Sequence, residues 1–175
     1  MKANLSNLVF TGFMGTGKSS IGQLSASALS FDFIDIDKEI ENRENMLISE
    51  IFATFGEAYF RRLESKLIEE ISLKTKTVIS TGGGVVLNPE NISNLRKNGI
   101  VILLKAEPEI IYRNVAKDKN RPLLNCENPM ARIIELLEAR KSYYENNDFE
   151  IDVSKLTIQE AALRAIQLFN NKCSS

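Results

Sequence analysis

Histidine is absent from this sequence, and cysteine occurs only twice. Without histidine the commonest general base is missing, so any proton transfer has to use a carboxylate, a lysine, a tyrosine or water. The two cysteines, Cys126 and Cys173, form no CxxC pattern and have no histidine to join them. We therefore expect reduced, non-catalytic thiols and no structural zinc. Aspartate and glutamate are therefore the expected catalytic groups.

The chain also lacks a surplus of charge and a long apolar run. Its 22 basic and 23 acidic residues give a net charge of −1, which offers no support for a nucleic-acid partner. No apolar run is long enough to span a membrane, and residues 1–11 do not resemble a signal peptide. We expect a cytoplasmic monomer with no membrane partner, and the 175 residues suit a single domain, 1–175.

A glycine-rich segment near the start of the chain carries the most specific signal. Residues 12–19 read GFMGTGKS, which fits the pattern G-x-x-x-x-G-K-[ST]. An apolar segment suited to a buried strand, 8–10, precedes it, and apolar residues at helical spacing follow it as far as Leu29. This order of strand, glycine loop and helix predicts a phosphate-binding P-loop.

The residue types of this loop explain how it would hold phosphate. Glycine permits backbone angles that let several amide N–H groups converge on an anion, and the helix that follows adds the positive end of its dipole. Lys18 would neutralise charge on the terminal phosphates, and the Ser19 hydroxyl would coordinate magnesium. The expected nucleotide-binding residues are Met14, Gly15, Thr16, Gly17, Lys18 and Ser19.

Strand-like and helix-like segments alternate along the rest of the chain. Period-two or continuous apolar patterns predict strands at 8–10, 33–37, 77–81, 100–104 and 149–153. A helical pattern over 49–73 is broken near Gly56, Asn88 and Pro89 suit the start of a helix, and residues 157–160 predict a capping box before the last helix. Alternation with helices predicts an α/β fold with a five-stranded parallel sheet covered on both faces, and ligands bound at the carboxyl ends of its strands. The longest insertion lies between the second and third strands, and we expect residues 33–62 to bind substrate.

Asp35 and Asp37 lie at the end of the second expected strand. Because they are two residues apart, both carboxylates would leave the same face of an extended chain and point into the cleft. One would hold magnesium through water, and the other would accept a hydroxyl hydrogen from the phosphate acceptor. The alternative is a solvated strand end or a helix cap.

Other candidate groups are arginines and a second glycine run. Arg61 lies on an amphipathic helix, and its guanidinium fork suits a substrate carboxylate. Gly82, Gly83 and Gly84 follow the third strand, where backbone N–H groups can approach a ligand. We expect residues 112–128 to form a mobile lid from which Arg121 closes over the transferred phosphate, and Arg140 on the next helix to face the cleft.

The P-loop alone leaves several classes of nucleotide-binding protein open. A GTPase is disfavoured because the chain has no N-K-x-D segment, and motors need far more chain than is present. A compact small-molecule kinase is therefore the leading class.

The combination of motifs resembles the shikimate kinase family over nearly the whole chain and in collinear order. The matching segments are GFMGTGKSSIG at 12–22, DID at 35–37, IFATFGEAYFRRLES at 51–65, STGGGVV at 80–86 and RPLL at 121–124. The P-loop occurs in many proteins, but its combination with the other four is far more specific. The resemblance implies a P-loop kinase fold.

The resemblance also implies a reaction, the transfer of the γ-phosphoryl group of ATP to the 3-hydroxyl of shikimate. On the nucleotide side, Lys18 and the P-loop amides would hold phosphate, Ser19 would bind Mg²⁺ directly and Asp35 would bind it through water. Arg121 would be the lid cation and a contact of ATP.

On the acceptor side, the resemblance implies that Asp37 binds shikimate hydroxyls and serves as base or orienting group. Arg61 and Arg140 would grip the shikimate carboxylate, and the Gly83 amide within the 82–84 loop would hold the substrate. The sequence departs from the family at Asn114, where an arginine that packs on adenine often occurs.

Two alternatives stay open from the sequence. One is another small-molecule P-loop kinase, of the gluconate or nucleoside monophosphate type, with a different acceptor in the insertion. The other is a non-catalytic nucleotide-binding regulator descended from a kinase. The presence of Lys18, Asp37 and Arg121 disfavours the regulator.

Overall fold

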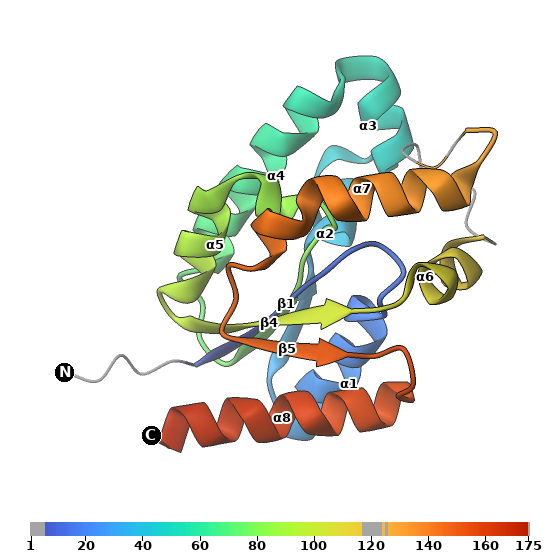
Figure 1. Cartoon of the computed structure of the whole chain (residues 1–175). Coiled ribbons are helices and arrows are strands. Elements are labelled where there is room, and N and C mark those ends of the chain that lie inside the picture. Colours follow the sequence, from blue (N-terminus) through green and yellow to red (C-terminus); the bar gives the residue numbers. More distant parts are fainter. Residues whose placement is uncertain (1–5, 117–123, 125, 175) are drawn as a thin grey trace.

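The computed structural model describes residues 6–116, 124 and 126–174, and its centre is a parallel sheet between two layers of helices (Figure 1). The five strands occur in the order β2-β3-β1-β4-β5, and all of their pairings are parallel. This confirms the predicted α/β class. The strands are β1 (Asn7–Thr11), β2 (Asp32–Asp35), β3 (Thr77–Ser80), β4 (Gly99–Lys105) and β5 (Phe149–Asp152).

Alternating side chains of the central strand β1 bury themselves against the two helical layers. Leu8 and Phe10 belong to one apolar cluster, and Val9 belongs to the other. This is the period of two that a strand covered on both faces requires. On the Leu8 side the sheet is covered by α1 (Lys18–Leu29) and α8 (Ile158–Ser174). On the Val9 side lie α4 (Glu57–Ile71), α5 (Pro89–Arg96), α6 (Pro108–Val115) and α7 (Pro129–Tyr144).

Capping side chains stabilise the starts of two helices, at positions where the sequence predicts caps. The Asn88 side chain accepts a hydrogen bond of 3.1 Å from the Glu90 amide and begins α5. Thr157 and Glu160 form a reciprocal capping box before α8. Gly56 separates α3 (Ile48–Phe55) from α4, as its position in the apolar pattern predicts.

The second strand is shorter than predicted. It ends at Asp35, and α2 (Ile36–Glu44) begins at the next residue, so Asp37 lies in the first turn of a helix. The Asp35 side chain accepts a hydrogen bond from the Lys38 amide, which makes Asp35 the N-cap of α2. A carboxylate there satisfies a free backbone N–H and interacts favourably with the helix dipole. The prediction that both carboxylates leave one face of an extended chain is therefore wrong.

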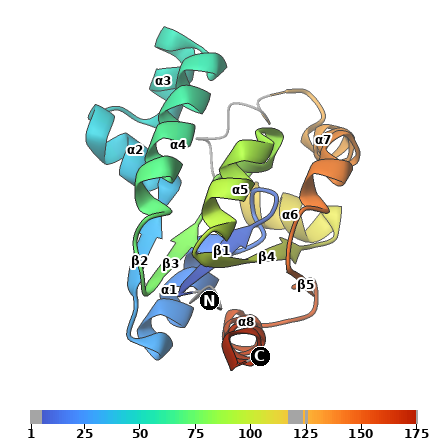
Figure 2. The same ribbon diagram turned by 90° about the vertical axis from the view of Figure 1, so that its left-hand side faces the viewer.

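Helices α2 and α3 and the start of α4 make up most of the 33–62 insertion. Figures 1 and 2 both show α3 at the end of the molecule farthest from the strands. A short 3-10 turn, η1 (Val85–Leu87), follows the glycine run after β3. No helix within the described ranges is long and apolar enough to cross a membrane.

Candidate active site

The P-loop connects β1 to α1 at the carboxyl edge of the sheet. Gly12, Gly15 and Gly17 all have positive φ, of 141°, 76° and 87°, as expected for a loop that folds around an anion. Lys18 is the first residue of α1 and is buried. Its ammonium group donates hydrogen bonds of 2.9 and 2.8 Å to the carbonyls of Gly12 and Phe13, and so lies over the loop.

Ser19 and Asp35 come together although they are on different elements. The Ser19 hydroxyl donates a short hydrogen bond to Asp35 Oδ2 and lies 3.4 Å from the hydroxyl oxygen of Ser80. The N-cap position fixes Asp35 at the start of α2, and the P-loop fixes Ser19 in the first turn of α1. The side-chain oxygens of both predicted metal-binding residues therefore lie at one point of the cleft.

One cavity joins the P-loop to the predicted acceptor side. Its volume is about 200 Å³, and it lies over the carboxyl ends of the central strands. It is lined by Met14, Gly15, Gly17, Lys18, Ser19, Ser20, Asp35, Asp37, Thr81 and Gly83. Asp37 reaches this cavity from the first turn of α2. The carboxylate therefore lies in the cleft as predicted, although it extends from a helix and not from a strand.

Thr16 uses its side chain within the loop itself. Its hydroxyl donates a hydrogen bond of 2.9 Å to the Phe13 carbonyl. Phosphate would therefore contact the backbone N–H of Thr16.

Asn114 also contacts the P-loop, because its side-chain amide donates to the Gly15 carbonyl at 2.8 Å. Arg121 lies outside the described residues.

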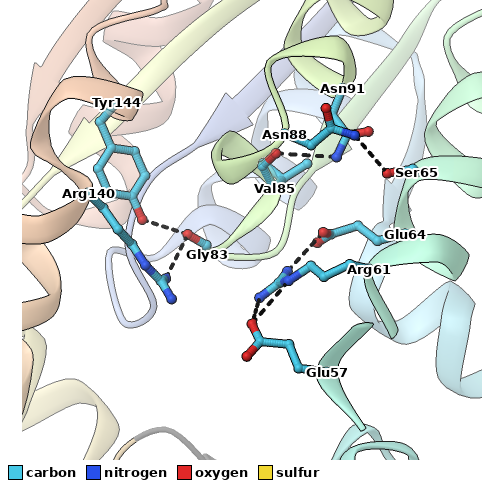
Figure 3. Close-up of polar contacts among 10 residues, drawn as sticks. All are labelled: Glu57, Arg61, Glu64, Ser65, Gly83, Val85, Asn88, Asn91, Arg140 and Tyr144. Atoms are coloured by element: carbon cyan, nitrogen blue, oxygen red, sulfur yellow. Dashed lines mark hydrogen bonds and ion pairs between the residues drawn. The ribbon is translucent and has the colours of Figure 1, made fainter. Parts of the chain in front are cut away.

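Arg61 lies on α4 between two glutamates (Figure 3). Its guanidinium donates a hydrogen bond of 2.8 Å to Glu64, one turn ahead, and one of 3.1 Å to Glu57, one turn behind. Both pairs have the i,i+3 or i,i+4 spacing that places side chains on one helix face. Arg62 instead packs over the ring of Tyr59, so the two adjacent arginines have different partners.

Glu64 is a functional candidate that was not predicted from the sequence. Its side chain is fully buried, and Oε1 has no hydrogen-bond partner among the described residues. Burial is the main cause that raises the pKa of Glu64 to about 7; the charges of Asp37 and Glu57 act in the same direction, and Arg61 opposes them. The signal was present in the F-R-R-x-E segment, where Glu64 follows Arg61 at helical spacing.

The glycine run after β3 lies at the junction of these groups. A side chain at Gly82 would place its Cβ 2.7 Å from Asp37 Oδ1 and 2.9 Å from Glu64 Oε1. A Cβ at Gly84 would overlap the Arg61 guanidinium, and one at Gly83 would lie 3.1 Å from the Met14 amide nitrogen. The absence of side chains therefore lets this backbone contact the P-loop, α2 and α4 at once.

Arg140 on α7 completes the set from the opposite side. It is buried, donates a hydrogen bond of 3.3 Å to the Gly83 carbonyl and packs over the ring of Phe13. The Tyr144 hydroxyl donates to the same carbonyl at 2.6 Å. Figure 3 shows Arg140 and Tyr144 approaching Gly83 from α7, while Arg61 and Glu64 extend from α4. Tyr144 is one helical turn after Arg140, and its place in the site was not predicted from the sequence.

Comparison with known proteins gives a consistent result. A family model described as Shikimate kinase matches residues 14–170. A curated protein named Shikimate kinase from Caldanaerobacter subterraneus subsp. tengcongensis is 52% identical over 94% of this chain and 96% of its own length. One of the same name from Thermoanaerobacter pseudethanolicus is 50% identical, over the same shares of both chains. The solved structure of shikimate kinase from Acinetobacter baumannii in complex with shikimate has a TM-score of 0.92 and 33% identity, and the match covers 97% of this chain and 96% of that one.

Proposed function

This chain belongs to the shikimate kinase family, and we propose that it transfers the γ-phosphoryl group of ATP to the 3-hydroxyl of shikimate. The hydroxyl oxygen bonds to phosphorus and loses its proton, while the bond from phosphorus to the departing ADP oxygen breaks. The product, shikimate 3-phosphate, lies on the route to chorismate and the aromatic amino acids.

The observation that carries this proposal is the cavity that P-loop residues share with Asp37 and Gly83. Phosphoryl transfer depends on positioning and charge stabilisation more than on covalent chemistry by the protein. A cavity lined by both a phosphate loop and a carboxylate would hold the donor phosphate and the acceptor hydroxyl in contact. Asp37 would accept or orient the hydroxyl proton. Histidine often has this role in other enzymes, but this chain contains none, so a carboxylate would take its place.

The acceptor side would be held by the two arginines and the glycine run between them. Arg61 and Arg140 reach the 82–84 segment from α4 and from α7. Guanidinium groups bind carboxylates through paired, charge-assisted hydrogen bonds, which suits the carboxylate of shikimate. We propose that the 33–62 insertion supplies Asp37 and Arg61 to this site, and that Gly83 contributes its amide.

Ser19 and Asp35 fit a magnesium ion by the chemistry of their donors. A hydroxyl and a carboxylate in mutual contact are hard oxygen ligands, and Mg²⁺ is usually held by one or two protein groups together with phosphates and water. In the part of the chain that the structure describes, no group of three or more His, Cys, Asp or Glu side chains is arranged to bind a metal, so phosphates and water would supply the other ligands. The bound ion would neutralise charge on the phosphates.

The remaining elements of the proposal come from the sequence. Residues 112–128 would act as a lid, and Arg121 would bring a cation to the transferred phosphate. A cytoplasmic location, a monomeric state and the lack of a nucleic-acid partner also remain predictions.

The test is an ADP-release assay with shikimate, gluconate and nucleoside monophosphates as separate acceptors. Turnover with shikimate and not with the others is the expected result. Turnover restricted to gluconate or to a nucleoside monophosphate would reject shikimate as the acceptor. Nucleotide binding without turnover of any acceptor would favour the non-catalytic regulator.

A further inference from the structure

Tyr144 makes a buried polar contact that the proposed chemistry does not use. It is the last residue of α7, its side chain is buried, and its hydroxyl donates to the Gly83 carbonyl at 2.6 Å. Burial raises the pKa of Tyr144 to about 12, with Arg140 acting in the opposite direction. The phenol therefore keeps its proton at neutral pH and donates it to the Gly83 carbonyl.

The carbonyl that Tyr144 holds belongs to the peptide unit that joins Gly83 to Gly84. This carbonyl also accepts the hydrogen bond from Arg140, and the α-carbon at the other end of the unit lies against Arg61, with 2.6 Å between a Cβ placed there and Arg61 Cζ. A trans peptide is planar, so its C=O and N–H point in opposite directions. Fixing the carbonyl toward α7 therefore directs the Gly84 N–H away from α7.

The residues on both sides of this peptide are glycines, which allow a wide range of backbone angles. The neighbouring peptides are held by the turn that follows, because the Val85 amide donates to the Gly82 carbonyl at 3.3 Å and the Leu87 amide to the Gly84 carbonyl at 3.1 Å. The Val85 carbonyl in turn accepts a hydrogen bond of 3.3 Å from the buried Asn91 side chain (Figure 3). Before the glycines, the Thr81 amide donates to the Phe10 carbonyl at 3.1 Å. Between these anchors, the described contacts of the Gly83 carbonyl are Arg140 at 3.3 Å and Tyr144 at 2.6 Å. The shorter bond comes from the tyrosine.

We propose that Tyr144 is a positioning residue for shikimate binding, whose hydroxyl sets the orientation of the Gly83–Gly84 peptide and, through the shared carbonyl, of the Arg140 guanidinium. This inference rests on the proposed function, because it assigns Tyr144 to the acceptor half of that site. Without the hydroxyl, the peptide can rotate between its glycines and Arg140 loses the fixed acceptor that aims it at the cleft. Affinity for the acceptor then falls, while the P-loop and its nucleotide are unaffected.

The test compares Tyr144→Phe with Tyr143→Phe, which removes the same atom from the neighbouring residue, whose side chain is exposed. Isothermal titration gives the dissociation constants for shikimate and, separately, for ADP. Steady-state kinetics give KM and kcat. The NMR chemical shift of the Gly84 amide reports the orientation of the Gly83–Gly84 peptide directly. Tyr144→Phe should raise the dissociation constant and KM for shikimate about tenfold, the effect of one lost hydrogen bond. It should move the Gly84 resonance and leave ADP binding and kcat within about twofold.

A merely structural role for Tyr144 predicts a different result. It would lower the melting temperature of Tyr144→Phe but leave the dissociation constant for shikimate equal to that of Tyr143→Phe, and that outcome overturns the proposal. An equal rise in the dissociation constants for shikimate and ADP would also overturn it. If the parent protein binds no shikimate, the proposed function fails, and the Gly84 resonance then decides by itself whether Tyr144 orients the peptide.

Discussion

The carboxylates of Asp37 and Glu64 converge on the same glycine. A Cβ at Gly82 would be 2.7 Å from Asp37 Oδ1 and 2.9 Å from Glu64 Oε1, so the two acids lie within a few ångström of each other. Asp37 reaches this point from α2 and Glu64 from α4, and Arg61 is the cation bound to Glu64. Two carboxylates this close in a buried site disfavour a second negative charge.

The raised pKa of Glu64 predicts that the protein loses stability as pH rises from about 4.5 to about 7. In this range the folded protein keeps the Glu64 proton and the unfolded chain releases it, so the folded state binds more protons and the free energy of unfolding falls with pH. A pKa of about 7 against an ordinary value of 4.5 corresponds to roughly 3 kcal/mol. Glu64→Gln should remove that part of the pH dependence, measured by urea unfolding at a series of pH values.

The matched control for this measurement is Glu57→Gln. Glu57 pairs with the same arginine, but its side chain is 45% exposed, whereas that of Glu64 is fully buried. The control should keep the pH dependence of the parent protein. If Glu64→Gln and Glu57→Gln had the same unfolding profile as the parent, Glu64 would not be the group that holds the proton.

Asp37→Asn should keep nucleotide binding and lose most turnover. The substitution preserves the size of the side chain, but it removes the negative charge that would accept or orient the acceptor hydroxyl proton. Loss of a general base typically lowers kcat by a factor of roughly 10² to 10⁴. The measurements are kcat with saturating shikimate and the dissociation constant for ADP. A folded variant that turns over at the rate of the parent would exclude this role for Asp37.

Arg61→Ala should weaken shikimate binding and change ATP binding little. Its guanidinium is bound by Glu57 and Glu64 and lies against the glycine run, and loss of one charge-assisted contact raises a dissociation constant by roughly 10- to 100-fold. Arg62→Ala is the control, since Arg62 packs over Tyr59. Equal affinities for shikimate in the two variants would contradict the assignment of Arg61 to the acceptor.

Local sequence patterns predicted much of the fold because local physics decides those parts. The P-loop, the break at Gly56 and the caps at Asn88 and Thr157 each depend on residues within a few positions of one another. The alternation of residues 33–37 misled for the same reason. Apolar and acidic residues at period two resemble a strand, but the Asp35 side chain also accepts a hydrogen bond from the Lys38 amide and caps α2, which begins at Ile36, one residue before Asp37.

The candidate site was only partly predictable because its supporting contacts are distant in sequence. Tyr144 and Gly83 are 61 positions apart, and nothing at either position indicates that the sheet topology will bring them together. Glu64 is three positions from Arg61, so its pairing could be read from helical spacing, but its burial beside Asp37 could not. Residues expected to contact ligand have distinctive chemistry, whereas the groups that hold them resemble ordinary core or surface residues.

Gly82→Ala tests whether the convergence of Asp37 and Glu64 matters for turnover. The new methyl group would lie 2.7 and 2.9 Å from the two carboxylate oxygens, closer than van der Waals contact allows, so at least one acid has to move. A shift of about 1 Å in a catalytic group can lower activity roughly 100-fold, so kcat with shikimate should fall while ADP binding stays near that of the parent.

Gly99→Ala controls for stability. Gly99 lies at the start of β4, away from the cleft, and its new methyl group would lie 2.6 Å from the Leu95 carbonyl oxygen. It should lower the melting temperature and leave kcat within about twofold. A similar loss of kcat in both variants would trace the effect to general overpacking, and the Asp37–Glu64 geometry would then not control the reaction.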